Sequence, residues 1–318
     1  MLLKLPPIIT PADFKRHFYC DAWRQVAASI CQRHGLAYNE LQRSDQGENV
    51  IFFVDDSYVI KIYEPSRAGH SREKAALEFA HGRLGVETPA IVQSGEVEGL
   101  AYLVMTRLPG VPMREVWASV GTPERIEIVS RLGVALRELH SRPAPRRTPT
   151  LKRDWLGFME GQARTAVERQ RDCGANTEWL ESLPSYIAAR LNLLPVDAEL
   201  VLLHGDVHPG NVMLATAGGH WRVIGLFDFG DSLIGFHEYE FVAPGVLMTQ
   251  GDRETQRALL LAYGYEETQL DLPLRARLML LTVLYECSDL RKYALRLAPG
   301  AVNLTLDELE AAIWRFTA

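Results

Sequence analysis

Residues 202–214 join two apolar runs through a polar loop, a combination that few folds accommodate. The stretch reads LLHGDVHPGNVML, so Asp206 and Asn211 fall five positions apart between apolar flanks. The glycines and the proline of this loop argue against a helix, because both residue types interrupt helices and favour turns. We therefore expect a buried strand, a polar loop and a second buried strand.

Two simpler interpretations of the loop stay open when it is taken alone. His204 and His208 are four residues apart, a spacing that on a helix would suit a zinc ion, although no third ligand follows at a suitable spacing. An ordinary turn, in which Asp206 and Asn211 cap backbone groups, would also explain the composition.

A second polar cluster follows the loop and favours a site. After a variable turn and the apolar run WRVIGLF, the chain reads DFGD at 228–231. Asp206, Asn211 and Asp228 then stand at the ends of short strands that can form a hairpin and bring the three side chains together. Oxygen ligands of this kind suit Mg²⁺, and a further carboxylate can accept a proton from an attacking hydroxyl. The pattern indicates phosphoryl transfer.

Such chemistry requires a lysine with an anionic partner, and the first third of the chain supplies one. Lys61 stands in mid-strand in VIKIY, where a lysine is costly unless a carboxylate pairs with it. Glu73, in the predicted helix that follows, is the expected partner, and Glu78 is the weaker candidate. A lysine that merely reaches the surface is the alternative.

The turn SDQGEN at 44–49 precedes a predicted strand and is a weaker signal. Gly47 would let backbone NH groups approach a phosphate, and Asn49 belongs to the same turn. A plain hairpin turn explains the segment equally well. The Walker A pattern is absent from the sequence, which excludes a P-loop NTPase.

The periodicity of apolar residues changes near residue 107 and predicts an α+β chain with two lobes. A small N-terminal sheet lobe with one inserted helix would span 1–107, and a larger, mostly helical C-terminal lobe would span 108–318. The expected strands are 49–54, 57–63, 89–95 and 100–106. The expected helices are 12–34, 71–83, 123–140, 155–172, 177–193, 252–263, 273–296 and 306–316.

Charge and composition narrow the partners. The net charge of −6 disfavours nucleic acid or an anionic membrane as the main partner. The four cysteines form no CxxC pair, so we expect them to be reduced. The most apolar stretch is too short to span a membrane, and the N-terminus does not read as a signal peptide. A cytoplasmic protein is expected, and its oligomeric state stays open.

Taken together, the motifs resemble the aminoglycoside phosphotransferase and choline-kinase-like superfamily, relatives of the protein kinases. The motifs that carry the resemblance are HGDVHPGN, FDFGD, VIKIY with SREKAALEF, and YLVMTRLPG, and they span residues 44–245. The resemblance implies a two-lobed, protein-kinase-like fold that binds ATP and Mg²⁺ in the cleft.

The resemblance also implies a role for each matching residue. Lys61 would contact the nucleotide phosphates and pair with Glu73, and the turn at Gly47 and Asn49 would lie near them. Asp206 would be the catalytic base. The remaining implied contacts are the magnesium ligands Asn211 and Asp228 and the adenine-binding backbone of Met105, Thr106 and Arg107.

Within the superfamily, the chain is most similar to the hygromycin B kinase type, through YLVMTRLPG, VIGLFDFGDSLIGFHEYEFV and LMLLTVLYECSDL. It departs from the common pattern after Asp231. Where many members carry Gly-Asp-Pro and then Asp, this chain has Gly-Phe-His at 235–237 and then Glu240, which would replace the structural Asp.

The sequence leaves more than one class of acceptor molecule open. An aminoglycoside carries several ammonium groups and needs carboxylates around it. The candidates are Asp231, Glu238, Glu286 and Asp289. The last two would share one helical face, or would simply meet Arg291 and Lys292 in solution. A kinase of another small hydroxyl compound, such as a sugar, amino alcohol or hydroxy-amino acid, is the main alternative. A protein kinase and a nucleotide-binding pseudokinase are further ones.

Overall fold

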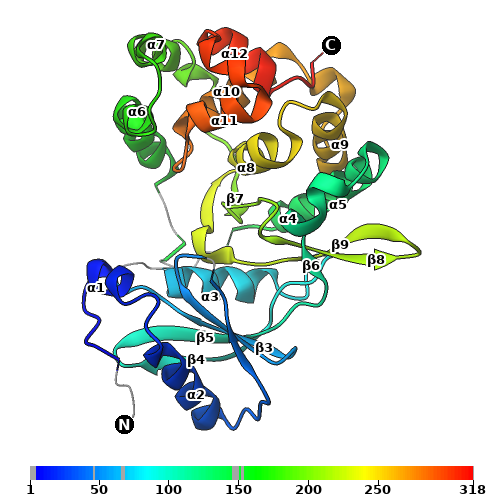
Figure 1. Ribbon diagram of the computed structural model, residues 1–318. Coiled ribbons are helices and arrows are strands. Elements are labelled where there is room, and N and C mark those ends of the chain that lie inside the picture. Colours follow the sequence, from blue (N-terminus) through cyan, green and yellow to red (C-terminus); the bar gives the residue numbers. More distant parts are fainter. Residues whose placement is uncertain (1–4, 46, 66–68, 145–149, 152–153, 318) are drawn as a thin grey trace.

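The structure is a computed structural model of the 318-residue chain. It describes residues 5–45, 47–65, 69–144, 150–151 and 154–317. Figure 1 shows two parts, one on each side of the segment near residue 107. No helix within these ranges is long and apolar enough to cross a membrane.

The N-terminal part is built on a five-stranded antiparallel sheet with the strand order β1-β2-β3-β5-β4. Its strands are β1 (Leu41–Arg43), β2 (Val50–Val54), β3 (Tyr58–Ile62), β4 (Ile91–Val97) and β5 (Leu100–Thr106). Its helices are α1 (Pro11–Arg16), α2 (Ala22–His34) and α3 (Gly69–Ala80). Helices α2 and α3 lie on opposite faces of the sheet (Figure 1). Because strand side chains alternate between faces, the sheet packs apolar residues against α2 and presents others toward α3.

The inserted helix expected at 71–83 is α3, whereas the helix expected at 12–34 is split into α1 and α2. Thr10 caps α1, and the chain then folds back so that the indole nitrogen of Trp23 donates to the His17 carbonyl oxygen at 2.8 Å. The ring of Trp23 packs on Phe14, which fixes the two helices against each other.

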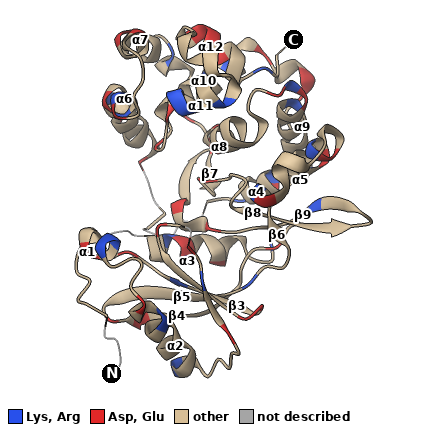
Figure 2. Cartoon of the chain, in the orientation of Figure 1, with Lys and Arg blue, Asp and Glu red and all other residues tan. Residues whose placement is uncertain are grey.

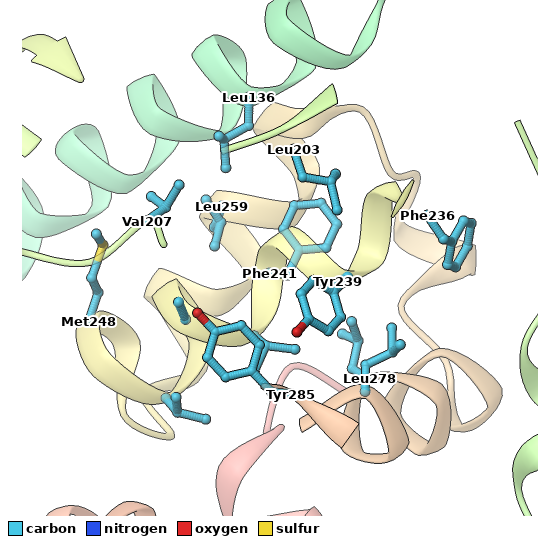
Figure 3. Close-up of a cluster of buried hydrophobic side chains, with 14 of the residues drawn as sticks. Leu136, Leu203, Val207, Phe236, Tyr239, Phe241, Met248, Leu259, Leu278 and Tyr285 are labelled. Carbon is cyan, nitrogen blue, oxygen red and sulfur yellow. The ribbon is translucent and has the colours of Figure 1, made fainter. Parts of the chain in front are cut away.

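The C-terminal part is mostly helical, as predicted. Its helices are α4 (Met113–Val116), α5 (Thr122–His140), α6 (Trp155–Asp172), α7 (Thr177–Ala188), α8 (Val242–Pro244), α9 (Arg253–Tyr263), α10 (Leu272–Leu284), α11 (Leu290–Leu297) and α12 (Leu306–Ile313). Its core lies where α5, α8, α9 and α10 meet β7, with Leu136, Leu203, Phe241, Leu259 and Leu278 packed together (Figure 3).

Five short strands carry the polar motifs of this part. They are β6 (Val111–Pro112), β7 (Leu200–Leu203), β8 (Val212–Ala217), β9 (His220–Leu226) and β10 (Leu233–Phe236). Strands β8 and β9 form the hairpin predicted from the sequence, and β7 pairs antiparallel with β10. The polar segments that follow β7 and β9 therefore emerge beside each other, and the segment after β9 packs against α3.

The predicted helix 273–296 is two helices. Helix α10 ends at Leu284, and Asp289 caps α11 by accepting from the backbone NH of Lys292 at 2.8 Å. The amide of Gln170 bonds both Ser288 and Leu290, which holds the connection in place. Glu286 and Asp289 therefore lie in a connection between helices and do not share a helical face.

Two backbone connections join the parts. The chain crosses at Gly110, whose φ of 90° is in the left-handed region, and a Cβ there would overlap the carbonyl oxygen of Leu214. A second link forms where Glu87 bonds the backbone of Ile224 at 2.7 Å and of Leu226 at 2.9 Å in β9. The chain crossing at Gly110 and the hydrogen bonds of Glu87 thus hold the two parts together on two sides of the site between them.

Candidate active site

The loop between β7 and β8 has its first residues fixed by the surrounding structure. The backbone NH groups of His204 and Gly205 donate to the two carboxylate oxygens of Glu240, at 2.6 and 2.9 Å. The Tyr285 hydroxyl donates to the Gly205 carbonyl oxygen at 2.8 Å. Gly205 has a φ of 84°, and a Cβ there would overlap the Asp231 carbonyl oxygen. Asp206 therefore follows a rigid, fully bonded turn.

Glu240 has a partner of its own beneath the loop. It is 2% exposed, and one of its oxygens lies 3.3 Å from Nε2 of His140. Burial works against its charge, but His140 and the backbone donors outweigh burial and lower the pKa of Glu240. The carboxylate is thus charged and accepts from the loop, which bears out the expectation that Glu240 takes a structural position.

Asp206 and Asn211 are held together by the loop. The amide Nδ2 of Asn211 donates to the Asp206 carbonyl oxygen at 2.9 Å and to its Oδ2 at 3.0 Å. The Asp206 side chain is 30% exposed, whereas Asn211 is buried. Because the nitrogen of the Asn211 amide is engaged, its oxygen is left to face a ligand.

Asp228 joins the two parts through an ion pair. It follows β9 with a φ of 64°, and its Oδ1 lies 2.6 Å from Nζ of Lys61 in β3. The same ammonium lies 2.7 Å from Oε2 of Glu73 in α3, which also accepts from the Tyr63 hydroxyl at 2.7 Å. The expected pairing of Lys61 with Glu73 is present in the structure. Figure 2 shows acidic positions, in red, on α3 and on the chain above it.

The electrostatics of this group follow from its geometry. Burial alone would lower the pKa of Lys61, which is 3% exposed, but the carboxylates of Asp228 and Glu73 raise it. Burial likewise opposes the charge of Asp228, but Lys61 lowers the pKa of that carboxyl. Lysine and aspartate are therefore both charged.

Three carboxylates concentrate negative charge at the loops. Partial burial, and then Asp206 and Asp228, raise the pKa of Asp231. An amide oxygen from Asn211 and a carboxylate from Asp228 are a donor set that suits Mg²⁺, which completes its shell with phosphate oxygens and water. Within the described ranges, His, Cys, Asp and Glu side chains alone form no cluster of three or more that could hold a metal ion. The residues present therefore fit a magnesium ion bound together with a nucleotide.

The two histidines of the loop have partners other than a metal. Nε2 of His204 lies 3.0 Å from the Phe227 carbonyl oxygen, and this side chain is fully buried. His208 lies 3.3 Å from Asp206 and bonds Gly210. This arrangement differs from the helical zinc pair that the spacing alone left open.

The segment expected to bind adenine is partly occupied by the sheet. The NH of Thr106 bonds the Ala90 carbonyl oxygen at 2.9 Å, and the NH of Arg107 bonds the Ser57 carbonyl oxygen at 2.9 Å. The Arg107 guanidinium donates to the carbonyl oxygen of Asp55 at 2.6 Å. These two NH groups are therefore not free to bind a base, and Met105 is paired inside the sheet.

Beside these NH groups, the carbonyl oxygen of Thr106 and the NH of Leu108 are the backbone groups that could bind a base. The NH of Ala90 donates to the Thr106 hydroxyl and not to its carbonyl oxygen. The NH of Leu108 makes no hydrogen bond to any described residue. Sequence reasoning missed Leu108, because only the strand register shows which side of the chain is free.

The turn at 44–49 lies near the loops. Asn49 Oδ1 accepts from the backbone NH of Glu64 at 3.3 Å, so its side chain is engaged. Gly47 has a φ of 97°. Glu48 contributes to the raised pKa of Cys287, which is about 11 and is due to burial first, then to Asp231, Glu286 and Asp206. The turn therefore faces the C-terminal part, and the phosphate-binding role of Gly47 and Asn49 stays a prediction.

The four acceptor-side carboxylates are not one cluster. The Asp231 side chain is 64% exposed and lies 3.7 Å from Arg72, and Glu286 is exposed nearby. Asp289 caps a helix. Glu238 is 2% exposed and lies 2.5 and 2.6 Å from two nitrogens of Arg277. A carboxylate so engaged cannot line an open cleft, so the structure removes Glu238 from the expected set.

Comparison with known structures establishes the fold. The GDP complex of aminoglycoside 2'-phosphotransferase-IIIa matches with a TM-score of 0.67 at 16% identity, covering 93% of this chain and 99% of that chain. The streptomycin–ATP complex of APH(2")-IIa matches with a TM-score of 0.58 at 17% identity, covering 92% and 98%. The architecture is that of the aminoglycoside kinases, a protein-kinase-like fold.

Sequence relatives are aminoglycoside 3'-phosphotransferases of Streptomyces fradiae, 28% identical over 168 residues, and of Streptomyces ribosidificus, 29% identical over 154 residues. The matches cover 50% and 46% of this chain, and the chain spans only 58% and 54% of those proteins. The model of the phosphotransferase enzyme family matches residues 41–280, a span that contains Lys61, Asp206 and Asp228, and the chain therefore belongs to that family.

Proposed function

We propose that the protein transfers the γ-phosphate of ATP to a hydroxyl of a small molecule, in the first place an aminoglycoside. One observation carries the proposal: the Lys61 ammonium, bonded to Glu73 and Asp228, lies opposite a rigid loop that presents Asp206 and Asn211. A buried cation next to exposed carboxylates and an amide suits a nucleotide with its metal.

In the proposed reaction each residue has one task. Asp206 accepts the proton of the acceptor hydroxyl, whose oxygen forms a bond to the γ-phosphorus. The bond from that phosphorus to the β–γ bridging oxygen breaks, and its electron pair leaves with ADP. Lys61 binds the phosphates, and Glu73 holds Lys61. Magnesium bound by Asn211 and Asp228 would neutralise phosphate charge.

The nucleotide base would bind where the chain passes between the two parts. The carbonyl oxygen of Thr106 and the NH of Leu108 are an acceptor and a donor two residues apart, which matches the donor and acceptor edge of adenine. We further propose that the chain divides at this point into a nucleotide-binding lobe, 1–107, and an acceptor-binding lobe, 108–318.

Exposed carboxylates support a cationic acceptor. Asp231 lies close to both Asp206 and Glu286, since burial and then the charges of these carboxylates raise the pKa of Asp231. Asp289 is half-buried at the start of α11 and can contribute its second oxygen. The sequence relatives act on the 3' position of aminoglycosides, whereas the motif likeness favours a hygromycin B type acceptor, which we retain as the finer proposal.

The test is ADP release by the purified protein with Mg·ATP and single acceptors. The panel is hygromycin B, kanamycin, gentamicin, streptomycin, choline, homoserine and common sugars. We expect saturable ADP release with one or more aminoglycosides. Turnover with choline, homoserine or a sugar alone would replace the aminoglycoside by a metabolite acceptor. No turnover with any acceptor, while ATP still binds, would overturn the enzymatic proposal.

A further inference from the structure

His208 contacts the proposed base, and no role in the reaction has so far been assigned to it. Its Nε2 lies 3.3 Å from Oδ2 of Asp206, and each side chain is 30% exposed. We propose that His208 is a positioning residue that orients the Asp206 carboxylate for proton acceptance. This inference rests on the proposed phosphoryl transfer.

Hydrogen bonding fixes which nitrogen of His208 carries the proton. The backbone NH of Gly210 donates to Nδ1 at 2.9 Å, so Nδ1 holds a lone pair. The single hydrogen of the neutral ring is then on Nε2, which faces Asp206. The ring therefore presents its protonated nitrogen 3.3 Å from Oδ2 of the carboxylate without needing a charge.

Two side-chain nitrogens approach the same oxygen of Asp206. Asn211 Nδ2 donates to Oδ2 at 3.0 Å, and His208 approaches this oxygen from its own side of the loop. In this proposal the Asn211 hydrogen bond and the His208 contact together restrict the rotation of the carboxylate and leave Oδ1 to accept the proton of the acceptor hydroxyl. The proton is accepted in the correct geometry only while the carboxylate keeps this orientation.

The loop backbone holds the ring in place. A Cβ at Gly210 would lie 2.9 Å from Nδ1 of His208, so the ring occupies the space that a larger residue would need. The NH of Asn211 bonds the His208 carbonyl oxygen at 2.9 Å, and the NH of Arg114 bonds the Pro209 carbonyl oxygen at 2.8 Å. The sequence HPGN thus places the His208 imidazole next to Gly210 and against Asp206.

The kinetic test uses four variants and the acceptor found in the panel. In His208→Gln the side-chain amide reaches the position of Nε2, whereas in His208→Asn it reaches only Nδ1. We expect His208→Ala and His208→Asn to lower kcat about 10- to 100-fold, part of the 10²–10⁴ that a general base contributes. KM for ATP should stay within about twofold, His208→Gln should recover most of kcat, and Gly210→Ala should lower kcat as His208→Ala does.

Three kinetic results would overturn the proposal. These are a wild-type kcat in His208→Ala, equal losses in the Gln, Asn and Ala variants, and a loss confined to KM for ATP. A thermal melt of each variant separates misfolding from a kinetic effect.

A second readout does not depend on the acceptor. In ¹⁵N-histidine-labelled protein, at a pH where the ring is neutral, His208 should show a proton on Nε2 and none on Nδ1, with the signal assigned by its loss in His208→Gln. Asp206→Asn should shift the Nε2–H resonance. A proton on Nδ1 would contradict the inference whether or not an acceptor exists. The expected tautomer without any turnover would leave the His208–Asp206 contact standing and remove only the enzymatic proposal.

Discussion

At the residue scale, Lys61 shows what the site demands of single side chains. A mid-strand lysine with almost no exposure is stable only because two carboxylates contact its ammonium, at 2.6 and 2.7 Å. One of these partners is twelve residues away and the other is on the far side of the site. The ion pairs of Lys61 therefore join the two parts of the molecule. They also hold its positive charge where the phosphates of a nucleotide would bind.

Glu73→Gln tests this connection against a matched neighbour. Losing a hydrogen bond to a charged group costs about 1.5–3 kcal/mol, which corresponds to about a 10- to 100-fold lower kcat/KM for ATP. Glu78→Gln, an exposed change on the same helix, should leave kcat/KM unchanged. Steady-state kinetics at varied ATP would show this, and equal effects of the two changes would refute the specific role of Glu73.

The sequence predicted single residues of the site well where a motif stands on a strand or a turn. Lys61 and Glu73 were predicted as a pair, and Asp206 and Asn211 were predicted on one loop. Leu108 was missed, because backbone availability depends on strand register. Glu238 was misplaced, because its neighbour Arg277 comes from a helix 39 residues away and no local pattern reveals that pair.

At the element scale, the 3₁₀ turn His237–Phe241 supports the loop after β7. It carries two buried carboxylates that face different partners. Glu240 accepts from the loop, whereas Glu238 pairs with Arg277 and with the Tyr265 hydroxyl at 2.9 Å.

The helix between 273 and 296 was predicted as continuous because its apolar spacing runs on. The break comes from tertiary contacts of Gln170 and from the cap at Asp289.

The two carboxylates of this turn should therefore differ when changed. Glu240→Gln places an NH₂ group against a backbone donor, so we expect a loss of about 1.5–3 kcal/mol in the free energy of unfolding and a lower kcat at temperatures where the variant is folded. Glu238→Gln should lower stability but leave kcat and the acceptor KM near wild type. Denaturant unfolding with kinetics on the folded variants checks both. A kcat loss in Glu238→Gln alone would contradict the assignment.

At the scale of the whole molecule, the partly buried His237 should make stability depend on pH. His237 lies behind β7, donates to the Tyr265 hydroxyl at 3.0 Å, and stacks on Tyr263. Burial, then His140 and Arg277, lower the pKa of His237 to about 4. The unfolded chain, with a pKa near 6.5, binds the proton more readily than the folded one, so stability is full above pH 6.5 and declines toward pH 4.

His237→Gln removes this contribution to the pH dependence. The stability of the wild type relative to the variant should fall by about 3 kcal/mol between pH 6.5 and pH 4, since each pKa unit is about 1.4 kcal/mol. Urea unfolding at several pH values measures the difference. His220→Gln, a change of an exposed histidine, serves as the control. A constant difference across this range would contradict the lowered pKa.

The two-part architecture itself was predicted, because strands cluster before residue 107 and helices after it. The break between α1 and α2 and the second link at Glu87 were not, since both depend on tertiary contacts. We propose that the two parts together place a base, Asp206, beside a bound nucleotide.

The role of Asp206 as the base can be tested by measuring ATP affinity and kcat side by side in the wild type and Asp206→Asn. Calorimetry with Mg·ATP gives the Kd, and ADP release with a saturating acceptor gives kcat. We expect a Kd within about twofold of wild type and a kcat lower by at least about 100-fold, as for loss of a general base. A kcat close to that of the wild type would remove Asp206 from the base role and contradict the account.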